Sequence, residues 1–392
     1  MNDSLYLAWN YLKYHWRKTC LLVLAISLVI FIPFALNYFT SKGSERMRIR
    51  AGSTPLLIGS EGSATDLCLS SLYFRKPDLP ALPYSKVLEL EKEGLAHPIP
   101  MNLEYRVKEQ PIVGTSNDYF TMRNTEFALG RPMAIIGECV LGAEAADKLK
   151  VNIGDAVISS PAGAFDVAGS FPLKMTVTGI LKPTNTADDE AVFTDLKTTW
   201  VISGKAHGHD DLATSGSDSL LLSKNDSVAI ASKAVLSYTE ITPANINSFH
   251  FHGNPDDYPV SAIIALPLDK KSELMLRGRF ETEDRSAQVI VPSEVMERLL
   301  ETVVSVKEII TLAAISIGLA TLVITLMVFA LSVRLRKKEI KTLKDIGAAP
   351  GRIKSVLSLE VLLVFTLSFG LTAVYLLLIN NFGLRLLENF IQ

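Results

Sequence analysis

The chain alternates between long apolar runs and mixed, mostly polar sequence. Three runs carry no charged residue: Thr19 to Ser41, Ile309 to Val333 and Val361 to Ile379. A helix needs about 20 apolar residues to cross the hydrocarbon core of a bilayer. The pattern therefore predicts three transmembrane helices. Pro33 lies inside the first run and predicts a kink or an early end of that helix.

The first apolar run shares one feature with a secretory signal peptide, because Lys13, Arg17 and Lys18 precede it. However, the run is longer than the roughly 7 to 15 apolar residues of a signal peptide, and no small-x-small cleavage site follows it. These two features favour an uncleaved helix. Before it, Leu5 to Trp16 is rich in aromatic and apolar residues, which predicts an interfacial helix that leads into the first span.

The long segment between the first and second apolar runs mixes strand and helix patterns. Strands are predicted at Pro111–Gly114, Met175–Leu181, Val260–Leu266 and Ala287–Val291. Helices are predicted at Ser85–Glu93, Ala143–Lys150 and Ser223–Tyr238. An α+β fold follows. Lys182 to Ser217 is rich in Thr, Asp, Gly and His, which predicts a joint between subdomains or an irregular lobe.

The segment just before the second apolar run has helical spacing, with apolar residues at Val295, Leu299, Val303 and Val306. We therefore expect one continuous helix from about Ser293 through the second span. Such a helix would transmit motion between the outer segment and the loop after the span.

The overall composition agrees with a membrane protein. Hydrophobic residues make up 48% of the 392 residues, the mean hydropathy is +0.27 and the net charge is −2, which gives no support for binding nucleic acid. Three cysteines are too few for a disulfide framework. Cys68 and Cys139 share the outer segment, and two buried thiols are favoured over a disulfide between them.

The distribution of Lys and Arg predicts the orientation. The loop from Arg334 to Lys354 holds eight basic residues against Glu339 and Asp345, and three more basic residues precede the first span. Basic loops stay on the cytoplasmic side. The N-terminus and this loop are therefore predicted to be cytoplasmic, and the long segment extracytoplasmic.

The basic loop also has an amphipathic pattern. Ile340, Leu343 and Ile346 recur three apart among the charged residues, which predicts a short helix. Gly347 suits the left-handed residue that ends such a helix, and Pro350 suits the first turn of the next one.

In this loop the chain resembles the MacB/FtsX/LolC-type permeases of ABC transporters, the mechanotransmission type. The match to the family's loop motif consists of Arg336, Lys337, Lys338, Glu339, Ile340, Leu343, Gly347, Ala348 and Arg352, and Glu360 lies where the family's third segment commonly has a Glu. In the outer segment, Gly130-Arg131-Pro132, Val140 to Asp155 and Val177 to Leu196 resemble the MacB-like extracytoplasmic core domain. The family usually has a fourth span, whereas only NNFGLRLLENFIQ follows Ile379.

Together with the three apolar runs, the resemblance implies a membrane protein with three transmembrane α-helices plus a large α+β extracytoplasmic domain inserted between the first and second. The expected parts are the interfacial and first transmembrane helices (residues 1–41), the MacB-like domain (42–305), the second span (306–333), the cytoplasmic coupling loop (334–354), the third span (355–380) and an extracytoplasmic tail (381–392), expected to be an amphipathic surface helix. The loop would dock on a separate ABC ATPase through Arg336, Lys337, Lys338, Glu339, Ile340, Leu343, Ile346, Gly347, Ala348 and Arg352. Because the chain has no G-x-x-x-x-G-K-[ST] motif, that partner would bind ATP and Mg²⁺.

The resemblance also implies a function. The chain would be the permease subunit of an ABC transporter in the bacterial inner membrane, working with two ATPase copies and a second permease copy as a homodimer or heterodimer. It would export or extract a lipoprotein, peptide or drug, with a periplasmic or lipoprotein partner. Two alternatives are an FtsX-like, non-transporting regulator of an envelope enzyme and a metal-linked envelope sensor. The chain is not expected to be an enzyme itself, since H-E-x-x-H and G-x-S-x-G are absent.

Two further features carry candidate chemistry. His207 and His209 precede two aspartates, and His250 and His252 lie near two more, so these imidazoles form a candidate Zn²⁺ site. A solvated loop and a strand with exposed histidines is the simpler interpretation. Glu360 is a charge at the start of the third span, where it has either a functional role or a structural pairing with Arg352 or Lys354.

Overall fold

The computed structural model describes residues 3–160, 172–208, 221–225, 228–231, 239–242, 245–282 and 286–391. It divides into two compact units. The first combines Met1–Met47 with Leu299–Gln392, and the second is Arg48–Arg298.

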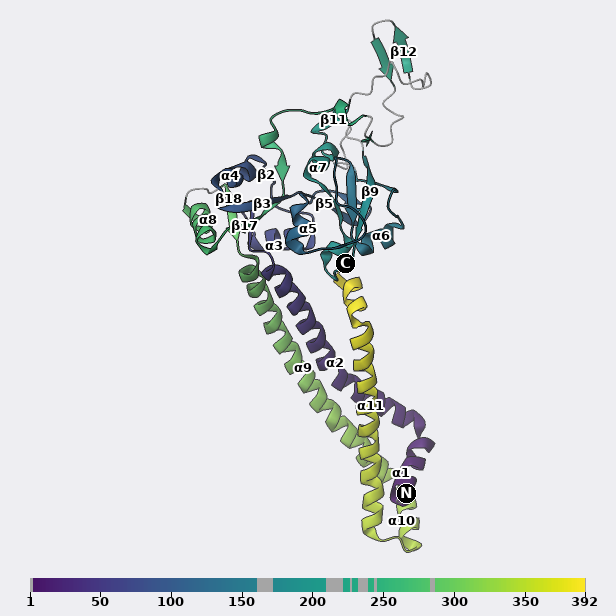
Figure 1. Cartoon of the computed structure of the whole chain (residues 1–392). Helices are drawn as coiled ribbons and strands as arrows, with labels where there is room; N and C mark the ends of the chain where they lie inside the picture. Colours follow the sequence, from purple (N-terminus) through teal and green to yellow (C-terminus); the bar gives the residue numbers. More distant parts are fainter. Residues whose placement is uncertain are drawn as a thin grey trace. The chain divides into compact units, whose positions relative to one another are not determined.

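The first unit is helical (Figure 1). Its elements are α1 (Asp3–Tyr14), most of α2 (Trp16–Gly52), most of α9 (Pro292–Leu335), α10 (Lys337–Asp345) and α11 (Pro350–Ile391). Within the described residues, three helices are long and apolar enough to cross a membrane: Trp16–Gly52, Glu308–Leu335 and Pro350–Asn380. The prediction of three apolar helices is therefore confirmed.

Two helix boundaries differ from the prediction. The helix α2 does not end near Pro33 but continues to Gly52. Proline removes only one backbone donor, and the apolar residues on both sides favour helix in a bilayer. After Asn380 the chain forms no separate surface helix, because α11 continues to Ile391. By contrast, α9 runs without a break from Pro292 to Leu335, as the helical spacing predicted.

Small and hydroxyl-bearing residues let α2 and α11 pack closely. The Thr372 hydroxyl donates to the Ser27 carbonyl oxygen at 3.2 Å and to that of Ser368 at 2.9 Å, and all three residues are buried. Leu12, Leu22, Ile26 and Val364 form an apolar cluster in the same unit. Such small-residue contacts and interhelical hydrogen bonds are the usual basis of helix packing in lipid.

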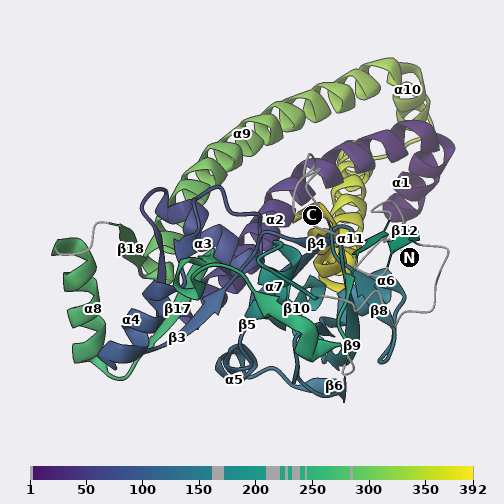
Figure 2. The same cartoon turned by 90° about the horizontal axis from the view of Figure 1, so that it is seen from above.

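The second unit contains two main sheets. The smaller has the order β18 (Ala287–Ile290), β1 (Leu56–Ser60), β17 (Ala262–Pro267), β3 (Ala96–Met101), and all its described pairs are antiparallel. Its helices are α3 (Ala64–Tyr73), α4 (Ser85–Glu93) and α8 (Lys270–Thr282); α4 lies along β3 and α8 along β18 (Figure 2). All of β1 is buried, in agreement with its three consecutive apolar residues Leu56, Leu57 and Ile58.

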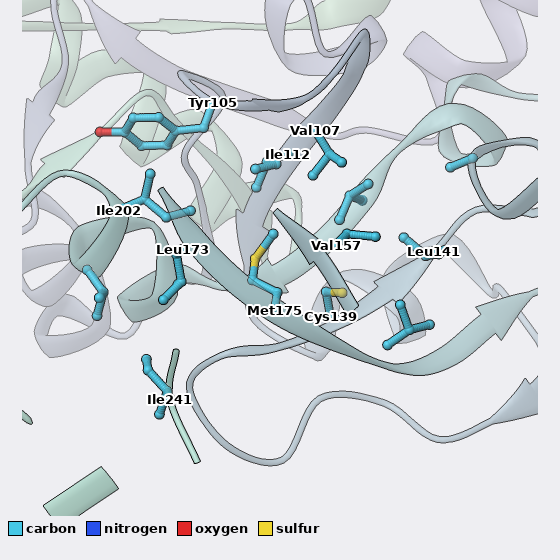
Figure 3. Close-up of a cluster of buried hydrophobic side chains, with 14 of the residues drawn as sticks. Tyr105, Val107, Ile112, Cys139, Leu141, Val157, Leu173, Met175, Ile202 and Ile241 are labelled. Carbon is cyan, nitrogen blue, oxygen red and sulfur yellow. The ribbon is translucent and has the colours of Figure 1, made fainter. Parts of the chain in front are cut away.

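The larger sheet is mixed. Its order is β14 (Thr239–Glu240), β9 (Leu173–Leu181), β7 (Glu138–Leu141), β10 (Val192–Asp195), β5 (Gln110–Thr115), β4 (Arg106–Val107), and β6 (Phe127–Gly130) and β8 (Ala156–Ile158) also pair with β9. Around it lie α5 (Asp118–Arg123), α6 (Ala143–Leu149), the 3₁₀ turn η1 (Ala187–Glu190) and α7 (Leu196–Ile202). Figure 3 shows its core, with Cys139, Val157 and Met175 pointing into one apolar cluster.

Three two-stranded pairs complete the described strands. They are β2 (Leu82–Pro83) with β16 (Pro259–Val260), β11 (Ala206–Gly208) with β15 (Phe249–Phe251), and β12 (Leu221–Asn225) with β13 (Val228–Ala231), and the short turns η3 (Ile246–Ser248) and η4 (Pro255–Asp257) flank β15. The helix predicted over Ser223–Tyr238 is wrong for its described part, which is the β12–β13 hairpin. Val228 and Ile230 alternate with alanines, and β-branched residues with period two favour a strand.

The α+β prediction for the second unit is thus confirmed. Cys68 on α3 and Cys139 on β7 are free and fully buried. Burial raises the pKa of the Cys68 thiol to about 11, and it raises the pKa of Cys139 as well. Both thiols are therefore unreactive in the folded unit.

Candidate functional site

The predicted coupling loop is a helix, a tight turn and a second helix. Lys337, Lys338, Glu339, Ile340 and Leu343 lie on α10. Ile346 ends the helix, and Gly347 follows with φ of +90°, the left-handed conformation that its sequence position predicted. Pro350 is the first residue of α11, and Ala348 and Arg352 lie before and after it.

The described side chains of α10 are mostly exposed. Lys337, Lys338, Lys341 and Lys344 are exposed, and Ile346 exposes 74% of its surface. The side chains of Glu339 and Leu343 lie outside the described residues. One large apolar side chain is therefore exposed beside a cluster of four lysines.

Arg336, which precedes α10, points away from this exposed surface and into the helical unit. Its guanidinium Nη1 donates to both carboxylate oxygens of Glu360, at 2.8 and 3.0 Å. Its Cζ lies 3.6 Å from the ring centroid of Tyr11, and the Tyr11 hydroxyl lies 3.1 Å from the Ser332 hydroxyl oxygen. The group thus joins α1, the end of α9 and α11.

Burial makes this ion pair important for the arrangement of the helices. The Glu360 side chain is 3% exposed and that of Arg336 15%. A carboxylate placed among apolar helices is costly unless a cation and hydrogen-bond donors satisfy it. The sequence indicated Arg352 or Lys354 as the partner of Glu360, whereas the structure shows Arg336. The side chain of Arg336 therefore makes a contact within the helical unit, and docking on an ATPase by Arg336 and the other residues of the set stays a prediction.

A second buried charge pair holds the last turn of α2 in the second unit. Arg50 is 6% exposed, and its Nη1 and Nη2 donate to the two Asp188 carboxylate oxygens at 3.0 and 2.9 Å. The Tyr119 hydroxyl donates to Asp188 at 2.7 Å and accepts from Arg50 Nη2 at 3.2 Å. The guanidinium also donates from Nε to the Leu72 carbonyl oxygen near the end of α3 and lies 5.4 Å from the Phe74 ring centroid.

The acceptor of this pair lies in a tight turn. Asp188 belongs to η1, and the Thr186 hydroxyl donates to its carboxylate at 3.1 Å. Its neighbour Asp189 accepts from the Thr184 and Asn185 backbone N–H groups at 2.8 and 2.6 Å, which fixes the shape of the turn. Burial alone would raise the pKa of Asp188, but the charge of Arg50 and the hydrogen bonds from Arg50 and Tyr119 lower it to about 2.

The Arg50 group therefore ties α2 to α3, α5 and η1 through one guanidinium. Arg123 extends it, because its Nη1 donates to the Ser53 hydroxyl at 2.8 Å. The sequence alone does not reveal this group. Arg50 is one of four basic residues after the first span, and it lies 138 positions from Asp188.

The predicted metal-binding histidines come partly together. The pairing of β11 with β15 places His207 opposite His250 in the register, and the rings of His250 and His252 lie 4.4 Å apart. His209 and the side chain of His207 lie outside the described residues. Within the described part of the chain, no group of three or more His, Cys, Asp or Glu side chains is placed to hold a metal. Metal binding stays a prediction.

The described chain thus consists of an α+β domain joined to helices that are long and apolar enough to cross a membrane. A family model described as the MacB-like periplasmic core domain matches residues 21–235, more than half of the chain. The chain therefore belongs to the MacB/FtsX-type permease family of ABC transporters. No curated protein matches it.

Two solved structures are similar to the chain at 12% identity. The periplasmic region of MacB from Actinobacillus actinomycetemcomitans aligns over 64% of this chain and 95% of that one, with a TM-score of 0.35. The extracellular domain of the noncanonic ABC-type transporter YknZ from Gram-positive bacteria aligns over 60% and 98%, with a TM-score of 0.32. Both TM-scores are below 0.5, so the family assignment is based on the match to the family model and not on these two structures.

Proposed function

We propose that the chain is the permease subunit that couples ATP hydrolysis in a separate ATPase to movement of its α+β domain. The observation that carries the proposal is the helix α10, whose exposed surface combines Ile346 with four lysines. An apolar side chain can fill a groove on a partner while the surrounding basic residues meet an acidic rim. ATP and Mg²⁺ would be bound by the partner.

The contacts of Arg336 supply a route for this coupling. Movement of α10 pulls directly on Arg336, whose guanidinium is held by Glu360 on α11 and stacks on Tyr11 of α1. The same movement acts on α9, a single helix whose first residues belong to the α+β unit. Switching by displacement of helices that contact one another is a common mode of conformational change.

The proposed orientation places the N-terminus and α10 in the cytoplasm and the α+β unit in the periplasm. The loop Arg334–Lys354 has eight basic residues, and basic loops are retained on the cytoplasmic side of the bacterial inner membrane. We assign the cargo to lipoproteins, peptides or drugs taken from the membrane or periplasm. Two permease copies, identical or different, would work with two ATPases.

Leu343→Glu tests the docking proposal. A carboxylate at the centre of the apolar positions of α10 is expected to reduce co-purification of the partner ATPase by about tenfold or more, because a charge in an apolar contact is costly. Thr342→Glu is the matched control, since it adds the same charge one residue away at an exposed position. Protection of Cys68 and Cys139 from a thiol reagent checks that the α+β unit stays folded. Unchanged co-purification of the Leu343→Glu protein would place the docking surface elsewhere.

A further inference from the structure

An apolar groove lies in the helical unit between the α1–α2 segment and α11. Its volume is about 410 Å³, and its walls include Trp9, Lys13, Trp16 and Cys20 on one side and Leu367 and Leu371 on the other. All of these residues belong to the same compact unit. Trp9, Lys13, Trp16 and Cys20 follow one another at intervals of three or four, so they share one face of the helical segment.

The lining of the groove is apolar except for Lys13, and we call the part of the groove beside Lys13 its mouth. The Thr19 hydroxyl in its wall donates to the Leu12 carbonyl oxygen at 3.1 Å, which satisfies that donor inside the protein. Lys13 is the only charged residue among those that line it. Trp9 and Trp16 are 48% and 62% exposed, and indole rings at such positions lie at the level of lipid headgroups.

A second basic side chain lies beside the mouth. The Arg17 guanidinium lies 5.7 Å from the Trp16 ring centroid, and the sequence has no Asp or Glu from Ser4 to Ser44. Lys18 points elsewhere, because its Nζ lies 5.8 Å from the ring centroid of Phe329 on α9. A zwitterionic headgroup gains little from Lys13 and Arg17, whereas an anionic headgroup is attracted by each basic side chain near the membrane surface.

We propose that this groove is a binding site for an anionic phospholipid of the surrounding bilayer. One acyl chain lies in the groove against Leu367 and Leu371, and the headgroup meets Lys13 between Trp9 and Trp16. The bound lipid fills the space between the α1–α2 segment and α11. This site is separate from the docking surface on α10, and its test does not require an ATPase.

Quenching of tryptophan fluorescence by brominated lipid tests the proposal with the full chain in vesicles. One set of vesicles contains one-fifth phosphatidylglycerol with brominated acyl chains in unbrominated phosphatidylcholine. The matched set contains one-fifth brominated phosphatidylcholine in unbrominated phosphatidylglycerol. Trp9 and Trp16 report on the groove, while Trp200 is 3% exposed in the core of the α+β unit and gives a constant background. We expect about a fivefold higher relative affinity for the anionic lipid from each basic side chain at the mouth.

Two controlled comparisons test whether the groove is responsible for the preference for phosphatidylglycerol over phosphatidylcholine. Lys13→Gln is expected to reduce this preference about fivefold. Lys42→Gln, near the other end of α2, is expected to leave it unchanged. A maleimide reacts with the exposed Cys20 and not with the buried Cys68 and Cys139, so it fills the groove and should abolish the preference. The Cys20→Ser protein treated in the same way should keep it.

Equal quenching by the two lipids would overturn the proposal, as would a preference that survives both Lys13→Gln and the maleimide. Weak quenching by both lipids would also overturn it, because the tryptophans would then be covered by protein, such as a helix of a second copy.

Discussion

Removal of either member of the buried pair Arg50–Asp188 should destabilise the α+β unit, but the two removals differ in their dependence on pH. Asp188→Asn leaves a guanidinium that cannot lose its proton in a site where Arg50 is 6% exposed. Arg50→Met leaves a carboxylate, which can take up a proton and become neutral. At acidic pH, Asp188→Asn should therefore lose more stability than Arg50→Met.

The structure also sets the expected magnitudes. Breaking a buried ion pair by removing one partner costs about 3–5 kcal/mol, and we expect this loss in the free energy of unfolding for Asp188→Asn. In the unmodified protein the pKa of Asp188 is lowered from 3.8 to about 2. This shift corresponds to a stabilisation of about 2 kcal/mol that is complete above about pH 4 and is lost as the pH falls toward 2.

In Arg50→Met the shift in the pKa of Asp188 changes direction. Without the guanidinium, burial raises the pKa of Asp188 above its usual value, so the folded state binds a proton more tightly than the unfolded chain. Stability of this variant should therefore increase when the pH falls from 7 to 4. The stability of Asp188→Asn has no contribution from this carboxyl and should lack that increase.

Urea unfolding followed by pulsed thiol labelling measures both effects in the full chain. In a Cys20→Ser background only the buried Cys68 and Cys139 remain, so labelling reports the unfolding of the α+β unit. A loss of 3–5 kcal/mol corresponds to a lower midpoint by about 1–2 M urea. A shift below about 0.3 M for Asp188→Asn, or parallel pH profiles for the two variants, would refute the assignment of Arg50 and Asp188 as a buried, mutually neutralising pair.

Three further predictions concern single positions. Glu360→Gln removes the charge that holds Arg336, and it should lower the thermal midpoint of the detergent-solubilised chain by several degrees, whereas Glu45→Gln on the exposed Lys42–Glu45 pair should not. Gly142→Ala would place a Cβ 2.1 Å from the Asp188 carbonyl oxygen. It should therefore lower the free energy of unfolding by about 1–3 kcal/mol, measured as a lower urea midpoint for the labelling of Cys139. Gly347→Val forces a β-branched residue to φ of +90°, at a cost of about 1–2 kcal/mol, and should speed trypsin cleavage after Lys344 at the end of α10 and after Arg352 in the first turn of α11; an unchanged cleavage rate would contradict a strained turn.

Local patterns were sufficient for the long helices and for much of the α+β unit. The periodicity of Val295, Leu299 and Val303 predicted that α9 begins before the membrane span, and Gly347 and Pro350 marked the turn between α10 and α11. Such signals depend on neighbours within one or two helical turns. The helix prediction for Ser223–Tyr238 failed in its described part, where short alternation in Val228–Ala231 outweighed a weak helical pattern.

The sequence by itself determined the class of this protein, because uncharged runs of about 20 residues, a basic loop and a family motif are each visible along the chain. It did not determine which charges meet. Arg50 and Asp188, separated by 138 positions, and Arg336 and Glu360, separated by 24, become partners only when packed elements bring them together. Basic residues near a span look alike in sequence, since their role depends on burial, and burial is decided by the tertiary structure.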